Sequence, residues 1–137
     1  MIQVLANIFE QGKTNIESSS KVKIVAEFLK AQIVQVYDLE GETFFDSSIP
    51  EYRLARFTFY QLLRKYTLIS HQMIGKHYQQ HGMNKRKALY ACAECDKRLA
   101  ESSYVSPQDK LFRSRYNTVE AALIQFLTKI NTNLINP

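Results

Sequence analysis

The chain has 137 residues, of which 45% are hydrophobic and 12% aromatic, with only four Gly and three Pro. This length suits one domain with its own hydrophobic core, and the composition excludes a disordered chain. No run approaches the roughly 20 apolar residues that span a bilayer, and the first residues do not form a secretory signal pattern. The two cysteines exclude an extracellular disulfide framework. We therefore expect a cytoplasmic protein that does not bind a membrane.

The formal net charge of +5 is distributed unevenly along the chain. Residues 52–93 contain eight Lys and Arg residues, all three His residues, and no Asp or Glu, whereas residues 1–51 hold twice as many acids as lysines. Such a basic segment attracts nucleic acids, acidic proteins or anionic membrane surfaces. The alternative is a solvated basic face without a partner.

A short amphipathic helix is predicted within residues 1–12. It ends at Gly12, a suitable C-cap, and the polar residues 13–20 follow as a linker. We therefore divide the chain into an N-terminal helix with its linker, residues 1–17, and a helical domain, residues 18–137. The apolar face of the first helix consists of Ile2, Leu5, Ile8 and Phe9.

The next helix is predicted from residue 21 to residue 36, with a short turn that ends by Gly41. An acidic and aromatic loop follows, and Pro50 opens a helix that runs to Tyr66, because proline is favoured in the first helical turn. The predicted inner residues of this helix are Ala55, Phe59, Leu62 and Leu63. Its basic face carries Arg53, Arg56, Tyr60 and Arg64.

Two further helices are predicted on either side of a glycine-containing turn. Ser70 caps the first helix, Gly82 lies just past its end, and Asn84 caps the second, which runs to about Glu101. Together they form a helix-turn-helix. The predicted inward residues are Met73, Ile74 and Tyr78 in the first helix, and Ala88, Cys92, Cys95 and Leu99 in the second.

A last amphipathic helix is predicted from Pro107 to about Ile130. Its predicted inward residues are Leu111, Val119, Leu123, Phe126 and Ile130. The expected fold class is therefore all-α, a helix-turn-helix bundle of about five to six helices.

Three consecutive cations follow Asn84, at the start of the second helix of this pair. Lys85, Arg86 and Lys87 oppose the positive end of the helix dipole, so the free protein holds them at a cost. The first turn of a recognition helix enters the major groove, where phosphates and guanine edges would relieve that repulsion. Arg86 can contact guanine, Asn84 can read adenine, and either lysine can neutralise a phosphate; three solvated cations are the alternative.

Several motifs in register resemble the C-terminal DNA-binding domain of the bacterial replication initiator DnaA, a Trp-repressor-like helix-turn-helix. They are Ala55-Arg56, "QLLRKYT", "LISHQMIGKHY" and "ALYAC", within a similarity that covers roughly residues 20–125. The resemblance implies a DNA-binding helical domain that functions in replication initiation or transcription regulation.

The sequence also departs from that family. Its Gly-Gly-Arg-Asp-His-Thr-Thr signature is replaced by "QQHGMNKRK", which is two residues longer, so the family's DNA box is not the expected target. The basic loop before the Arg56 position is replaced by the acidic and aromatic residues 41–48, which removes phosphate contacts. The ATPase module is absent, so the chain is not expected to melt an origin.

Three other patterns carry little weight. The string "GKT" at residues 12–14 lacks the earlier glycine and the preceding strand of a phosphate-binding loop. His77, His81, Cys92 and Cys95 can be drawn as two pairs of zinc ligands, but the cysteines share the apolar stripe of their helix, which favours buried structural thiols. No catalytic arrangement stands out, and we expect neither an enzyme nor a cofactor or metal.

Two functions remain. The first is a double-stranded DNA-binding protein, with Arg56 in the minor groove and residues 84–87 in the major groove. The second is a protein-interaction module on the same scaffold, which binds an acidic or other partner through the loop at Phe44-Phe45 and the terminal helices; exposure of that loop would favour it. Residues 1–17 could also mediate a homodimer. The candidate DNA-binding residues are Arg53, Arg56, Arg64, Lys65, Ser70, His71, Lys76, Asn84, Lys85, Arg86 and Lys87.

Overall fold

The computed structural model describes residues 15–100 and 105–135, and side chains within residues 20–100 and 105–130. The described residues form helices without any strand, which confirms the all-α fold class. The predicted N-terminal helix lies outside the described residues. The elements are α2 (Asn15–Tyr37), α3 (Pro50–Thr67), α4 (His71–His77), the 3-10 turn η1 (Gln79–His81), α5 (Lys85–Leu99) and α6 (Pro107–Ile135).

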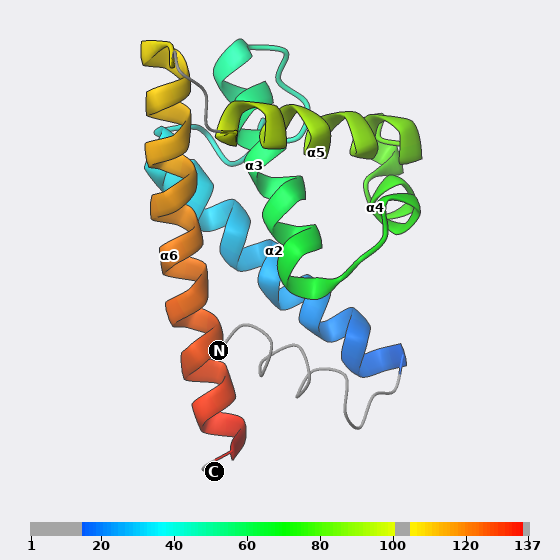
Figure 1. Ribbon diagram of the computed structural model, residues 1–137. Coiled ribbons are helices and arrows are strands. Elements are labelled where there is room, and N and C mark those ends of the chain that lie inside the picture. The colour runs from blue at the N-terminus through cyan, green and yellow to red at the C-terminus, as the bar shows by residue number, and fades with distance from the viewer. Residues whose placement is uncertain (1–14, 101–104, 136–137) are drawn as a thin grey trace.

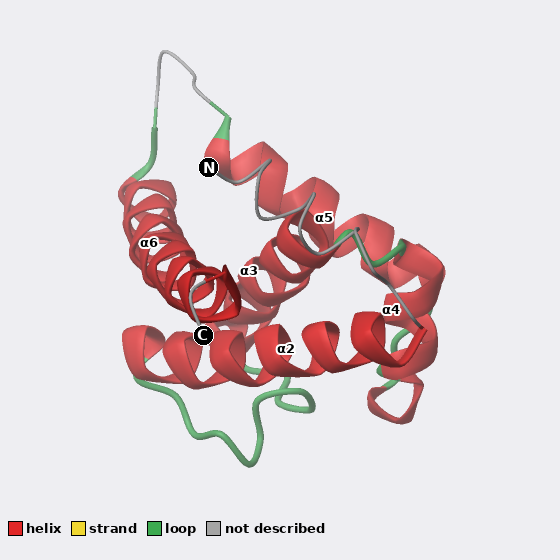
Figure 2. Ribbon diagram, turned by 90° about the horizontal axis from the view of Figure 1, so that it is seen from below, coloured by secondary structure: helices red, strands yellow, loops and turns green. Residues whose placement is uncertain are grey.

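Helix α3 is the central element of the bundle (Figure 1). It packs against α2, α5 and α6, while the long helices α2 and α6 contact each other along one side. Helix α4 packs against α5 at the end that lies away from α6. The view from below shows the same arrangement, with α2 crossing under α3 and α6 (Figure 2). This packing leaves α4 and the start of α5 at one edge of the molecule.

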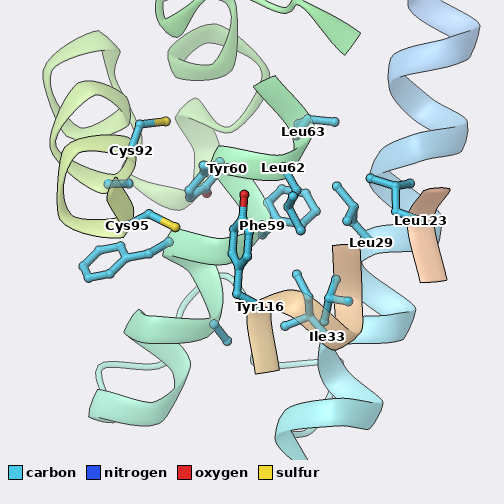
Figure 3. Close-up of a cluster of buried hydrophobic side chains, with 14 of the residues drawn as sticks. Leu29, Ile33, Phe59, Tyr60, Leu62, Leu63, Cys92, Cys95, Tyr116 and Leu123 are labelled. Atoms are coloured by element: carbon cyan, nitrogen blue, oxygen red, sulfur yellow. The ribbon is translucent and has the colours of Figure 1, made fainter. Parts of the chain in front are cut away.

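The hydrophobic core forms where α3 meets α2, α5 and α6 (Figure 3). Phe59 and Leu62 of α3 and Leu29 of α2 have no exposed surface. Burial of each such side chain contributes roughly 1.5–3 kcal/mol, so α3 is held from several directions. The four inner residues predicted for this helix, Ala55, Phe59, Leu62 and Leu63, are all fully buried.

Helix α2 starts earlier than the sequence predicted. It begins at Asn15, so residues 15–20, which were expected to belong to a linker, are helical. The proposed boundary after residue 17 therefore falls within this helix. Polar residues can continue a helix whose later turns are fixed by packing, because helical stability in proteins comes mostly from the buried face.

The inward face of α6 differs by one position from the prediction at its N-terminal end. Leu111 is 49% exposed, whereas Phe112 and Tyr116 are buried. Since adjacent helical residues point about 100° apart, the stripe that starts at Phe112 places Val119 and Leu123 inward, as predicted, and leaves Leu111 outside. Met73 of α4 was also predicted inward and is instead 42% exposed, because this short helix packs through Ile74.

The loop between α2 and α3 folds back over α3. Asp38 has a positive φ of 56°, and the Leu39 amide bonds the Val34 carbonyl at 2.9 Å, which ends α2. Phe44 is fully buried. Its ring packs edge to face against the Phe59 ring, with the two ring centroids 5.6 Å apart. The loop is therefore part of the packed fold.

Candidate nucleic-acid interface

Helices α4 and α5 both begin at the N-caps that the sequence predicted. The Ser70 hydroxyl accepts a hydrogen bond from the Met73 amide at 3.1 Å, and Asn84 Oδ1 accepts one from the Lys87 amide at 2.8 Å. These bonds satisfy amides that have no partner within the helix. The two caps fix where α4 and α5 start.

Gly75 lets α4 approach the start of α5 closely. A Cβ atom at this position would lie 2.6 Å from the Lys85 amide nitrogen and 2.7 Å from the Asn84 carbonyl carbon. Both neighbours are backbone atoms, so neither can rotate away. The contact holds the first turn of α5 against α4, and no spacing pattern in the sequence predicts it beyond the glycine itself.

The connection between α4 and α5 contains the turn η1. Gly82 has a φ of 79°, a left-handed conformation that favours glycine, and the Met83 amide bonds the Tyr78 carbonyl at 3.2 Å. The turn η1 lies within residues 79–87, the segment that replaces the DnaA signature and is two residues longer than it. It brings His81 beside the loop before α3, where His81 Nδ1 lies 3.0 Å from Asp46 Oδ1.

The first turn of α5 presents its three cations to solvent. Lys85, Arg86 and Lys87 are all exposed, together with Asn84. Lys87 Nζ donates to the Gly82 carbonyl at 2.9 Å, whereas the structure gives no partner for the side chains of Lys85 and Arg86 among the residues it describes. Two of the three cations are therefore held without compensation at a helix N-terminus.

A second basic group flanks the start of α4. His71 is half-buried and lines the same hollow as Arg64, and its pKa is lowered by burial first and then by the positive charges of Arg64 and Lys85. Arg64 donates to the Ile69 carbonyl at 3.2 Å. Ser70 and Lys76 are exposed on the same helix–turn segment. This group is continuous with the start of α5 through Lys85.

Arg56 and Tyr60 of the predicted basic face of α3 are not fully exposed. Arg53 is exposed, whereas Arg56 is half-buried and donates from Nη1 to the Phe44 carbonyl at 2.8 Å. Tyr60 was predicted on this face and is only 2% exposed, so that prediction is wrong. The Tyr60 ring instead packs against the Tyr78 ring at the end of α4, with the centroids 5.5 Å apart, a contact that the periodicity of α3 alone does not show.

Lys65 pairs with α6. Its Nζ lies 2.7 Å from Glu120 Oε2, and the same carboxylate oxygen accepts from the Tyr66 hydroxyl at 2.7 Å. Lys65 therefore forms an ion pair within the described part of the fold, unlike the other cations predicted to bind DNA.

Exposed apolar side chains lie beside the cations of α5. Leu89 is 44% exposed and Tyr90 is 52% exposed, one turn after the basic triplet. Neither residue was predicted to belong to the site, although both lie outside the inner stripe of Ala88, Cys92 and Cys95. Apolar side chains at such positions can contact thymine methyl groups in a major groove.

The two cysteines of α5 are buried free thiols. Burial raises the pKa of Cys92 to about 11, which keeps the thiol protonated and unreactive at neutral pH. Among residues 15–100 and 105–135, no group of three or more His, Cys, Asp or Glu side chains is placed to hold a metal ion. In the same part of the chain, no helix is long and apolar enough to cross a membrane.

A scan against protein-family models found no match to this chain, and neither curated proteins nor solved structures gave one. The resemblance to the DnaA domain therefore depends on the sequence motifs alone, and the site must be interpreted from its own geometry.

Proposed function

We propose that this protein binds double-stranded DNA through the first turn of α5, in replication or transcription control. The observation that carries the proposal is the exposed triplet Lys85–Lys87 on a capped helix that Gly75 fixes against α4. A helix held in this way can enter a major groove without reordering. The surrounding residues 52–93, which lack any Asp or Glu, add a positive field that favours a polyanion.

The structure supports a division of roles within this turn. The Asn84 oxygen already accepts the Lys87 amide, so bidentate reading of adenine would compete with the helix cap. Arg86 is exposed and its guanidinium can make a bidentate contact to guanine. We therefore assign base reading to Arg86 and phosphate contacts to Lys85, with Arg64, His71 and the other basic residues around α4 in supporting contacts.

The burial of the aromatic loop favours DNA over the protein-interaction alternative. Phe44 is fully buried, and Phe45 is half-buried between Phe59 and Tyr78, with ring centroids 5.3 Å and 5.1 Å away. Neither phenylalanine thus offers the exposed apolar surface that a protein-docking role was expected to require, and the exposed apolar side chain of this loop is Ile49 at its end. An acidic protein partner remains the alternative ligand for the same cations.

We also propose that the protein acts in the cytoplasm and binds DNA without catalysing a reaction. A homodimer on paired half-sites would increase specificity, but the residues expected to mediate it, 1–17, fall almost entirely outside the described part of the chain.

The decisive experiment is selection from a random duplex library at moderate salt, followed by titration of the enriched duplex. We expect an enriched motif and a loss of affinity when Lys85, Arg86 and Lys87 are all replaced by Ala. The matched control for net charge is the replacement of Lys97, Lys110 and Lys129 by Ala, which removes three exposed cations of α5 and α6 away from the basic triplet. The absence of an enriched motif, or equal affinities of the triple variant and the control, would refute the proposal.

A further inference from the structure

A cleft of about 470 Å³ opens between the loop before α3, the first turns of α3 and the first turns of α5. Four side chains that can carry positive charge line it: Arg53, Arg56, His81 and Lys87. They come from α3, η1 and α5, which are separate in the sequence. The tertiary fold, rather than any local motif, therefore concentrates positive charge in this concave surface.

Asp46 is the one carboxylate among the residues that line the cleft. Its Oδ1 lies 3.0 Å from His81 Nδ1, so it is already paired with the imidazole. Arg53 and Arg56 lie one turn apart, and both burial and the charge of Arg53 lower the pKa of Arg56. Arg56 is thus partly desolvated while Arg53 stays exposed, and neither guanidinium forms an ion pair with a carboxylate among the described residues.

Each of the three strong cations keeps donors for a ligand. Arg56 uses Nη1 on the Phe44 carbonyl, and Lys87 uses Nζ on the Gly82 carbonyl at 2.9 Å. A guanidinium has five N–H donors and an ammonium has three, so most remain available. The Ser47 hydroxyl accepts from the Ile49 amide at 3.2 Å and can itself donate toward the cleft.

We infer that this cleft binds a phosphoryl group through Arg53, Arg56 and Lys87. A single carboxylate would neutralise one of these charges, whereas a phosphoryl group carries more charge and presents several oxygens to the guanidinium forks. The exposed Tyr90 ring, whose centroid lies 6.0 Å from that of buried Phe57, borders the cleft and offers a surface for a neighbouring sugar or base.

Two sources can supply this group. One is a backbone phosphate of duplex DNA beside α5, and this source rests on the function proposed above. The other is a free molecule that carries a phosphate, which does not depend on DNA binding. Lys87 belongs both to the cleft and to the first turn of α5, so either ligand would contact the start of that helix.

The first arm of the test uses inorganic phosphate at constant ionic strength. Amide resonances of Ser47, Ser48 and Lys87 in nitrogen-15 correlation spectra should shift and saturate as phosphate is added. Arg53→Gln should weaken this binding by about tenfold, the effect of one lost charged hydrogen bond. Arg53 is exposed, so its replacement should leave the fold intact. Lys110→Gln is the control for net charge and should leave the shifts unchanged.

The second arm measures the affinity for labelled duplex across a salt series. If the phosphoryl group belongs to DNA, Arg53→Gln should reduce the slope of log affinity against log salt by about 0.9, while Lys110→Gln should not. If phosphate shifts the amide resonances saturably but Arg53→Gln leaves the salt slope of duplex binding unchanged, the cleft binds a free phosphate-carrying molecule rather than DNA. Phosphate shifts in a protein that binds no duplex refute the DNA proposal and leave the cleft standing. If Arg53→Gln matches Lys110→Gln in both arms, the inference is overturned.

Discussion

Replacement of Gly75 by Ala tests the contact that fixes α5 against α4. The added Cβ would lie 2.6 Å from the Lys85 nitrogen and 2.9 Å from the Asn84 Cα, both shorter than any ordinary contact. Because backbone atoms of the α5 cap surround the site, relief requires α4 or the start of α5 to move. Overpacking of this kind costs about 1–3 kcal/mol.

Alanine also has an intrinsic advantage over glycine within a helix of about 1 kcal/mol, which partly offsets the clash. Because the clashing neighbours are backbone atoms, we expect the overpacking cost at the upper end of its range and a net loss of about 2 kcal/mol in the free energy of unfolding. The same change should weaken duplex binding beyond the loss of stability, because the basic triplet would no longer hold its position relative to α4.

The assay is urea unfolding followed by circular dichroism, with duplex titration under conditions where the variant is folded. Gly41→Ala is the matched control, since its Cβ would meet nothing within 4 Å. If Gly75→Ala and Gly41→Ala unfold with free energies within about 0.5 kcal/mol of each other, the close packing of α4 on α5 does not stabilise the fold and the reasoning fails.

The remaining predictions concern single side chains of the same region. Asn84→Ala removes the cap of the Lys87 amide and should destabilise the protein by about 1 kcal/mol, measured by urea unfolding. Arg86→Ala should leave stability equal or raise it by a few tenths of a kcal/mol, yet weaken binding to the selected duplex by roughly 1–3 kcal/mol. The pKa of His71 is lower in the folded protein than in the unfolded chain, so the unfolded chain binds more protons on acidification. The free energy of unfolding should therefore fall as the pH drops below about 6.5, and His71→Gln should flatten this part of the pH–stability curve. Cys92 should react with a thiol reagent in the folded protein far more slowly than in urea.

The features that the sequence predicted correctly depend on local interactions. Pro50 opens α3, and Ser70 and Asn84 cap their helices, because each of these residues acts within one helical turn of its own position. The four inner residues predicted for α3 are also buried, but this central helix packs on several sides and buries five more: Tyr52, Phe57, Thr58, Tyr60 and Tyr66.

The features that the sequence missed depend on contacts between distant segments. Tyr60 follows the periodicity of an exposed face, but its ring packs against that of Tyr78, 18 positions further along the chain. The pairing of Lys65 with Glu120 joins residues 55 positions apart, so no pattern within α3 could have revealed it. The cleft between α3 and α5 likewise depends on contacts between distant segments. Arg53 and Lys87 were predicted as candidate DNA-binding residues, but no local pattern shows that they line the same cleft.

The positions of the cations bear on why this fold tolerates them. Two interactions stabilise the start of α5: Asn84 accepts a hydrogen bond from the Lys87 amide, and Gly75 packs against the backbone of Asn84 and Lys85. Neither involves the charged groups of Lys85 and Arg86, which face solvent. A stabilised surface would instead place an acid at this helix N-terminus, where the dipole favours negative charge. The folded state therefore retains repulsion that an anion would relieve, and this difference between the free and bound states adds to the binding free energy. For that reason we expect Asp or Glu at position 85 or 86 to stabilise the isolated protein while abolishing its affinity for duplex DNA.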